Sequence, residues 1–263
     1  VIALVNGALT FKIRESEKKA NKKIEKENTL KLYNTLLNSL SHELRTPIST
    51  IIGATDTLQE GKNKLSEENR TELISEISKA SLRLNRQVGN LLNMSRLESG
   101  FLQPKTDWCD VNELVYDVVN QLHDNLQGKK IHIKIAETIP LVKLDYGLLE
   151  QILLNLLHNA AIYMSENGII TVHAMISKEN KLLMAVEDNG PGFPENEISH
   201  VFDKFYRLKN SKTGGTGLGL SIVKGFVESM NGNIILENRN EGGAKFTIEI
   251  PAEIAYLKDI EHE

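Results

Sequence analysis

Apolar residues spaced three and four positions apart fill two segments near the start of the chain, and they constrain the fold more than any other feature. The first series is Leu30, Tyr33, Leu37, Leu40, Leu44, Ile48, Ile51, Thr55 and Leu58, and the second is Ile77, Ser81, Leu84, Val88, Leu91 and Ser95. This spacing is typical of a heptad seam on an α-helix. The break from Gly61 to Ser66 makes the pattern that of an antiparallel helical hairpin. A lone hairpin cannot cover its own apolar stripe, so we expect a second copy to complete a four-helix bundle.

The pattern changes in kind after Gly100. Residues 101–110 contain Pro104 and polar side chains, which predict a linker. Beyond it, helical patterns cover residues 111–126, 145–164 and 217–230, and alternating strand patterns cover 130–136, 168–177, 181–188, 233–239 and 244–250. This order of helices and strands predicts an α/β sandwich with helices on one face of a sheet.

The fold class is therefore multidomain, with an all-α hairpin followed by an α/β sandwich. The predicted parts are residues 1–29 as a membrane-proximal apolar end and basic helix, 30–100 as a dimerisation domain, 101–110 as the linker, 111–251 as the sandwich and 252–263 as a C-terminal tail.

Composition narrows the class of protein. Hydrophobic residues make up 40% and charged residues 25% of the chain, which is typical of a soluble globular protein. The net charge of -4 disfavours a protein whose main task is to hold nucleic acid, because that task needs a clustered basic surface. Cys109 is the single cysteine, so an internal disulfide cannot form and a reducing compartment is favoured.

The opening residues VIALVNGALTF are apolar and precede a lysine-rich stretch diluted with glutamate. The run is shorter than the ~20 residues that cross a bilayer. It fits the end of a membrane span with positive charge on its cytoplasmic side, and it also fits an ordinary N-terminal helix. We expect the former, which makes the chain a soluble, cytoplasmic domain of an inner- or plasma-membrane protein anchored N-terminal to this fragment.

The segment SLSHELRTPIST places His42, Glu43, Thr46 and Pro47 inside the first predicted helix. Proline costs a helix interior about 3 kcal/mol, so a local bend beside a histidine indicates a site rather than packing. A surface histidine alone is usually no more than that. Glu43 strengthens the case, because a carboxylate can orient an imidazole and accept its proton. Thr46 lies one helical turn after Glu43, where its hydroxyl could position a water.

Four further stretches predict a second site: NLLHNAAIY (155–163), DNGPG (188–192), FDKFYRL (202–208) and GGTGLGLSIVK (214–224). Asn155 and Asn159 lie four apart on a helix, so both amides point the same way, as a shared ligand or metal requires. Asp188 ends a strand before a Gly-Pro-Gly turn, where a flat base can approach the backbone and the carboxylate can accept a hydrogen bond from an amino group. The glycines before the last helix leave amides exposed at its N-terminus, where they would bind phosphate.

Each stretch also has a plainer interpretation. An asparagine pair is often exposed helix polarity, DNGPG alone is a turn, and a lone glycine-rich loop is weak evidence. The Walker sequence GxxxxGK followed by Ser or Thr is absent from the chain. The joint occurrence of all four stretches in this order is what indicates a nucleotide site.

SHELRTPI resembles the phospho-acceptor box of histidine kinases with a two-helix dimerisation domain. The other four stretches resemble the N, first glycine, F and second glycine boxes of their Bergerat-type (GHKL) ATP-binding domain. The resemblance covers roughly residues 30–251. The order of motifs, the segment WCDVNELV and the apolar-then-basic start also resemble the potassium-sensing, Kdp-type sensor kinases.

This resemblance implies a sensor histidine kinase core of a two-component system. His42 would take a phosphoryl group from Mg-ATP, with Glu43 as its base, and would pass it to an aspartate of a cognate response regulator. Thr46 would serve dephosphorylation of that regulator, and residues 30–100 would form the homodimer. Asn159 would meet Mg²⁺ and Asp188 would read the adenine amino group.

The resemblance also implies a mobile lid from Asp203 to Thr216. The ATP-binding residues that it implies are Asn155, Asn159, Tyr163, Asp188, Gly190, Gly192, Lys204, Arg207, Gly215, Thr216, Gly217, Leu218 and Gly219.

One position departs from the family pattern, because Ile162 stands where family members commonly carry a lysine. Losing a charge-assisted hydrogen bond to phosphate costs about 1.5–3 kcal/mol, or about ten- to a hundredfold in affinity, unless a lid cation replaces it. Two other functions stay open. A hydrolytic ATPase resembling gyrase, MutL or the heat-shock chaperones would carry a water-activating glutamate where Asn155 stands, and a non-catalytic dimeric scaffold would have lost ATP turnover.

Overall fold

A computed structural model describes residues 41, 43–61, 65–100, 102–136, 138–165, 167–208 and 215–256. The chain divides into two compact units, Val1–Leu84 and Asn85–Glu263. His42 and the first part of the predicted heptad seam lie outside the described residues.

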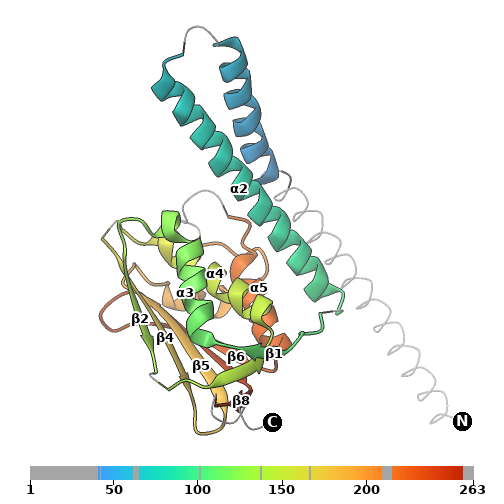
Figure 1. Ribbon diagram of the computed structural model, residues 1–263, viewed down its shortest axis with the longest axis vertical. Helices are drawn as coiled ribbons and strands as arrows, with labels where there is room; N and C mark the ends of the chain where they lie inside the picture. Colours follow the sequence, from blue (N-terminus) through green and yellow to red (C-terminus); the bar gives the residue numbers. More distant parts are fainter. Residues whose placement is uncertain are drawn as a thin grey trace, which may run out of the picture. The chain divides into compact units, whose positions relative to one another are not determined.

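The first unit contains a helical hairpin, as the heptad spacing predicts (Figure 1). Its first arm is helical over residues 43–60, including Pro47, and its second arm belongs to α2 (Glu67–Glu98), which runs on into the second unit. Ser66 is the N-cap of α2, because its Oγ accepts a hydrogen bond from the Asn69 N–H at 3.2 Å. Two glutamates in the first turn of α2 complement the helix dipole.

The second unit is built on a five-stranded sheet with the strand order β2-β4-β5-β7-β6. The strands are β2 (Lys130–Ile135), β4 (Ile169–Ile176), β5 (Lys181–Asp188), β6 (Asn233–Asn238) and β7 (Ala244–Pro251). Only the β2–β4 pair is parallel among these neighbours, and the other pairs are antiparallel. Burial alternates along β4, β5, β6 and β7, so one face of the sheet is covered and the other is open to solvent.

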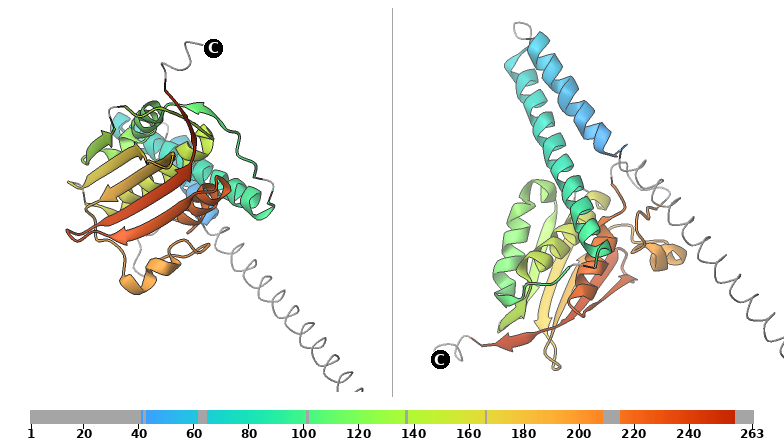
Figure 2. Two further views of the ribbon diagram at one scale, coloured as in Figure 1. Left: turned by 90° about the horizontal axis from the view of Figure 1, so that it is seen from below. Right: turned by 90° about the vertical axis from the view of Figure 1, so that its right-hand side faces the viewer.

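Three helices cover one face of this sheet (Figures 1 and 2). They are α3 (Val111–Gln121), α4 (Tyr146–Tyr163) and α5 (Gly219–Ser229). Asp145 is the N-cap of α4, since its carboxylate accepts a hydrogen bond from the Leu148 N–H at 3.0 Å. Asp110 caps α3 in the same way. The buried faces of these helices meet the covered face of the sheet in one core. The predicted α/β sandwich is therefore confirmed.

A second, three-stranded sheet has the order β1-β3-β8 and is antiparallel throughout. Its strands are β1 (Asp107–Cys109), β3 (Leu141–Leu144) and β8 (Glu253–Ala255). β1 lies within the segment interpreted as a linker and β8 within the segment interpreted as a tail. Strands of three or four residues are too short to carry a readable alternation, so the sequence pattern does not signal them.

Two helix predictions differ from the structure at their ends. The segment predicted as one helix over residues 111–126 is α3 followed by a 3₁₀ turn, η1 (His123–Leu126), because the helix closes at Leu122. α5 starts at Gly219 rather than at residue 217, where Gly217 has φ +69° and so cannot continue an α-helix. A further 3₁₀ helix, η2 (Glu195–His200), precedes the F-box segment.

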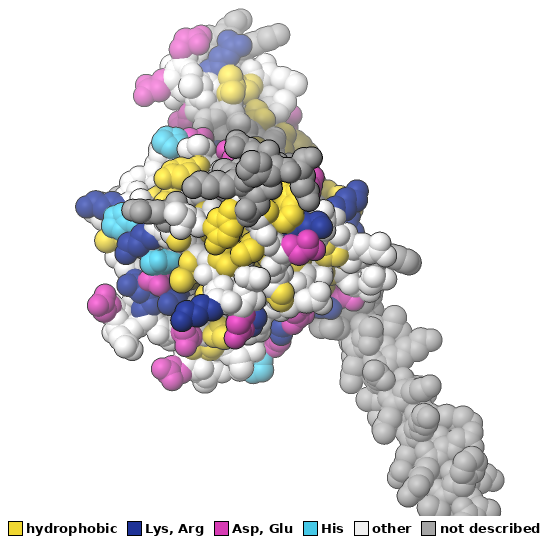
Figure 3. Space-filling model, turned by 60° about the horizontal axis from the view of Figure 1, so that its bottom comes forward, with side chains coloured by type: hydrophobic (Ala, Val, Ile, Leu, Met, Phe, Trp, Pro, Cys, Tyr) yellow, Lys and Arg dark blue, Asp and Glu magenta, His cyan; other side chains and the backbone are white. Residues whose placement is uncertain are grey.

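The face presented in Figure 3 carries cationic, anionic and hydrophobic side chains intermixed rather than a patch of one charge. Among the helices that the structure describes, none combines the length and the low charge that a bilayer-crossing segment requires.

Candidate functional site

Asp188 lies at the last position of β5, where the strand leads into the Gly-Pro-Gly turn. Its Oδ1 accepts hydrogen bonds from the N–H groups of Gly190 at 2.8 Å and Ala244 at 3.3 Å. Burial raises the pKa of Asp188 above its ordinary value, and the two N–H donors and the nearby Arg239 oppose that rise. Within the described part of the chain both bonds end on Oδ1, so Oδ2 is the oxygen that can accept a hydrogen bond from a ligand.

The two glycines of the turn are required by close packing. A side chain at Gly192 would come within 2.7 Å of the Asn238 Oδ1, and Gly192 also has φ +67°, which favours glycine. A side chain at Gly190 would come within 2.9 Å of the Asp188 Oδ1 and 3.3 Å of Met164. The turn therefore packs against the C-terminal end of α4, next to Tyr163.

α4 carries the predicted asparagine pair and Tyr163. Asn155 and Asn159 are both partly buried, and Tyr163 is the last residue of the helix and is exposed. The Asn155 Nδ2 donates to the Gln151 carbonyl at 2.8 Å, which turns its Oδ1 toward α5. A side chain added at Gly219 would meet that Oδ1 at 3.3 Å. The N box and the second glycine box are thus in contact at the first residue of α5.

The F box and the second glycine box meet at Phe205 and Gly217. The Phe205 N–H donates to the Gly217 carbonyl at 2.9 Å, and a side chain at Gly217 would lie 2.6 Å from the Phe205 backbone. Gly217 has φ +69° and Phe205 has φ +64°, so both residues adopt the left-handed conformation at this contact. The predicted lid is therefore pinned near both ends, and residues 209–214 between them lie outside the described part of the chain.

The cations predicted to contact phosphate are exposed on the F-box segment. Lys204 forms an ion pair with Glu98 of α2, and Arg207 is exposed. Ile162, at the position where the family pattern has lysine, is partly buried on α4.

The second glycine box changes from exposed to buried along its length. Gly215 is exposed, Thr216 is 8% exposed and Leu218 is fully buried immediately before α5. The structure thus places the candidate nucleotide residues on the C-terminal half of α4, at the end of β5, on the F-box segment and around the start of α5.

The candidate phospho-acceptor site lies in the first unit. His42 itself is outside the described residues. Glu43 is only 13% exposed and pairs with Arg83 of α2 at 3.3 Å, so the two arms of the hairpin are bridged beside the histidine position. Thr46 is exposed one turn later, and Pro47 is buried.

Sequence reasoning missed three residues that shape these sites: Arg83, which pairs with Glu43, and Asn238 and Arg239, which contact the turn after Asp188. Phe205 lies within the predicted F-box stretch, but the sequence does not indicate its contact with Gly217. The turn-forming sequence NRNEGG after β6 marks a tight hairpin, yet nothing local to it indicates what the hairpin contacts.

The candidate residues fit a nucleotide and its magnesium ion. Mg²⁺ prefers oxygen ligands, usually a few protein groups together with phosphates and water, and the asparagine amides of α4 can supply such oxygens. Within the described ranges, His, Cys, Asp and Glu side chains do not gather in groups of three or more that could hold a metal ion. Asp188 and the close-packed glycines beside it can receive a flat base.

Two family models match the chain in the order of its two units. The model described as the His Kinase A (phospho-acceptor) domain matches residues 33–100. The model described as the histidine kinase-, DNA gyrase B- and HSP90-like ATPase matches residues 144–254. The chain belongs to the sensor histidine kinases, with a phospho-acceptor hairpin followed by an ATPase domain of this fold.

Known proteins agree with this assignment. The chain is 34% identical to the sensor protein KdpD of Escherichia coli K12 over all of its own length and 29% of that protein. It is 32% identical to the sensor protein KdpD of Clostridium acetobutylicum over 92% of this chain and 27% of that protein. It therefore spans less than a third of these relatives. The crystal structure of full-length ShkA in complex with AMPPNP has a TM-score of 0.63 and 27% identity, over 84% of this chain and 46% of ShkA.

Proposed function

We propose that the chain is the kinase core of a sensor histidine kinase. In this core, bound Mg-ATP would phosphorylate His42, and the phosphoryl group would then pass to an aspartate of a response regulator. The observation that carries this proposal is the presence, in one chain, of a hairpin bearing a histidine beside Glu43 and of a domain bearing Asp188 in a glycine-lined turn. Phosphoryl transfer needs an acceptor, a base and a nucleotide, and these two units supply the groups for each.

In the first step a ring nitrogen of His42 would attack the γ-phosphorus of ATP. A nitrogen–phosphorus bond forms, the bond from that phosphorus to the bridging oxygen breaks, and ADP leaves. Glu43 would accept the proton from the opposite ring nitrogen. The Arg83 guanidinium, 3.3 Å from the Glu43 carboxylate, supports this role because it fixes the position of the carboxylate between the two arms of the hairpin.

In the nucleotide domain Asp188 would accept a hydrogen bond from the adenine amino group. Asn155 and Asn159 would place their oxygens toward the magnesium ion, which supplies charge neutralisation for the phosphates when it is bound. Lys204 and Arg207 are the cations that would offset the missing lysine at Ile162. The partner of Lys204 is Glu98, so phosphate would compete with that carboxylate for the lysine.

The remaining parts of the proposal concern the whole protein. Residues 30–100 would pair with a second copy, the partner substrate would be a cognate response regulator, and Thr46 would help remove phosphate from that regulator. A membrane anchor would precede this fragment. The two KdpD relatives are sensor proteins by name, which agrees with a Kdp-type kinase.

The test is incubation of the chain with γ-labelled ATP and Mg²⁺, followed by acid treatment. We expect an acid-labile label on the protein that is absent from His42→Gln. Free phosphate without labelled protein would instead identify a hydrolytic ATPase, and no nucleotide binding would identify a scaffold.

The phosphatase role is tested separately with Thr46→Ala. This variant should keep autophosphorylation and should remove phosphate from the regulator about tenfold more slowly, in line with the loss of a water-positioning group. Equal loss of both activities would refute the division of labour, and Thr50→Ala, one turn further along the same helix, is the matched control.

A further inference from the structure

Two consecutive residues, Asn238 at the end of β6 and Arg239 after it, hold both ends of the turn that carries Asp188. The Asn238 side chain makes two hydrogen bonds to Phe193, accepting its N–H at 2.8 Å and donating to its carbonyl at 2.7 Å. The Arg239 Nη1 donates to the Asp188 carbonyl at 2.9 Å. Since Phe193 directly follows Gly192, the turn is fixed at its first residue and at the residue after its last.

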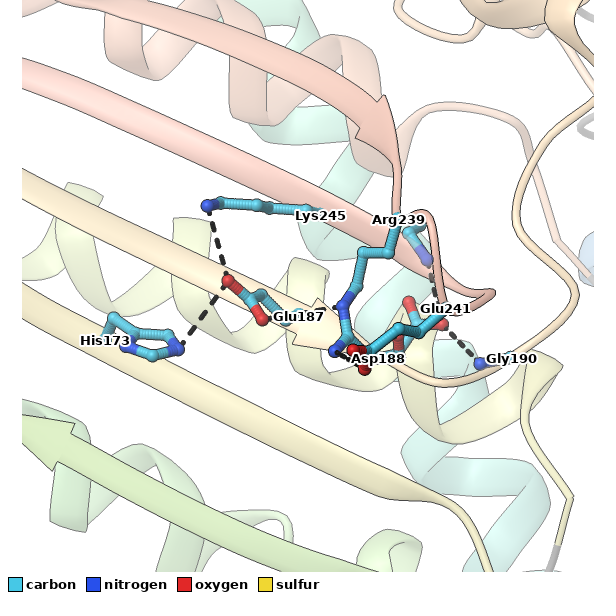
Figure 4. Close-up of polar contacts among 8 residues, drawn as sticks. His173, Glu187, Asp188, Gly190, Arg239, Glu241 and Lys245 are labelled. Atoms are coloured by element: carbon cyan, nitrogen blue, oxygen red, sulfur yellow. Dashed lines mark hydrogen bonds and ion pairs between the residues drawn. The ribbon is translucent and has the colours of Figure 1, made fainter.

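Arg239 is itself held in place by acidic groups on the open face of the sheet (Figure 4). Its Nε lies 3.5 Å from the Glu187 Oε2, and its Nη2 lies 3.7 Å from the Glu241 carboxylate. Glu187 is only 18% exposed and also forms an ion pair with Lys245 at 3.4 Å, and the His173 Nε2 lies 3.6 Å from its Oε1. A planar guanidinium can bond a carboxylate and a carbonyl at once, which a lysine ammonium does less well.

The backbone of the β6–β7 hairpin also lies directly against the turn. Gly243 has φ +96°, and a side chain there would come within 1.9 Å of the Asp188 carbonyl oxygen. The Arg239 N–H donates to the Gly243 carbonyl at 2.9 Å, which closes the hairpin at this contact. The Asp188 carboxylate is thus positioned by the hairpin through both backbone and side-chain bonds.

We propose that Arg239, together with Asn238, positions Asp188 for recognition of the adenine base. This inference rests on the proposed role of Asp188 and deepens it. Arg239 bonds the backbone of Asp188 and leaves the Oδ2 to the ligand, so its loss lets the turn move and weakens base recognition. The transfer of phosphate at saturating ATP does not depend on that bond.

The experiment compares Arg239→Met with Lys245→Met, because both remove a cation from Glu187 and only Arg239 bonds to Asp188. ATP affinity is measured by calorimetry with Mg²⁺, GTP affinity in the same way, and autophosphorylation at saturating ATP. We expect Arg239→Met to weaken ATP binding about tenfold and to reduce the preference for ATP over GTP, with the rate at saturation kept within about twofold. Lys245→Met should change ATP affinity less than about twofold, and Arg239→Lys should restore part of the loss.

Fluorescence of Trp108, the single tryptophan, verifies that each variant is folded. If Arg239→Met does not fold, Asn238→Ser tests whether the hydrogen bonds from the hairpin position the turn. Equal effects of Arg239→Met and Lys245→Met would overturn the inference. Unchanged ATP affinity and unchanged ATP preference in Arg239→Met would also overturn the inference. If Asp188→Asn still weakened ATP binding in that case, the proposed function would stand. Normal ATP binding by Asp188→Asn would overturn the role of Asp188 and this inference together.

Discussion

The two units of this chain differ in how completely they bury their apolar side chains. In the second unit the largest core residues, among them Leu153, Ile222 and Phe226, are almost fully buried between the helices and the sheet. In the described part of the hairpin, Ile52, Ile74 and Leu82 are 54%, 53% and 68% exposed. The nucleotide domain therefore closes its core within one chain, whereas the hairpin leaves a stripe that needs another surface.

This difference explains why one chain holds two kinds of site. The nucleotide residues depend on contacts that a closed core holds in place, such as Gly217 against Phe205. The hairpin carries its candidate residues on helices whose outer stripe is available for a second copy. A change in the core of one unit should therefore leave the other unit largely intact.

The largest expected effect comes from opening the closed core with Phe226→Ala on α5. Truncating a buried phenylalanine costs about 3–5 kcal/mol, because the lost contacts are replaced by a cavity. Trp108 lies in β1 of the second unit, so its fluorescence during urea unfolding reports this loss. Tyr116→Ala on α3 is the control, since Tyr116 is 53% exposed and should change stability by about 0.5 kcal/mol or less. If Phe226→Ala also changed the mass of the dimer, the core of the second unit would not be independent of the hairpin, and the comparison of the two units would be contradicted.

A smaller effect is expected from placing a charge on the hairpin stripe with Leu82→Glu. In a symmetric dimer the substitution enters the interface twice, and burying an unpaired carboxylate should weaken association about a hundredfold. Light scattering over a concentration series measures this, and ATP affinity should stay unchanged. Glu76→Lys is the matched control, because it changes charge at an exposed position of the same helix about 120° round from Leu82. A wild-type chain that is monomeric at micromolar concentration would refute the dimer itself.

The smallest expected effect is the acid sensitivity of the second unit. Burial, and then the nearby Arg86, lowers the pKa of His158 on α4 from 6.5 to about 4. The unfolded chain thus binds more protons than the folded chain between these values, so stability falls as the pH drops through this window. From pH 7 to pH 5.5 the loss attributable to His158 is about 1 kcal/mol.

Urea unfolding followed by Trp108 fluorescence at the two pH values checks this loss. His158→Gln should flatten the pH dependence, and His132→Gln, at an exposed position of β2, should keep the slope of the wild type. A slope that is the same in His158→Gln as in the wild type would contradict the assignment.

Much of the fold could be predicted because its signals are local. The helical hairpin, the start of α4 at Asp145 and the positions of β2, β4, β5, β6 and β7 all follow from spacing and capping residues. The order of five motifs likewise predicts both candidate sites. Asp188 at the end of a strand and before a glycine turn is visible in the sequence alone.

What the sequence by itself determined was the identity of the candidate chemical groups and the class of each unit, because periodicity, capping and glycine turns act between near neighbours in the chain. Only the tertiary structure decided that β2 pairs parallel with β4, that three short strands form a second sheet, and that Asn238 and Arg239 hold the turn after Asp188. These features join residues distant in sequence, and their energies depend on contacts that no local pattern encodes.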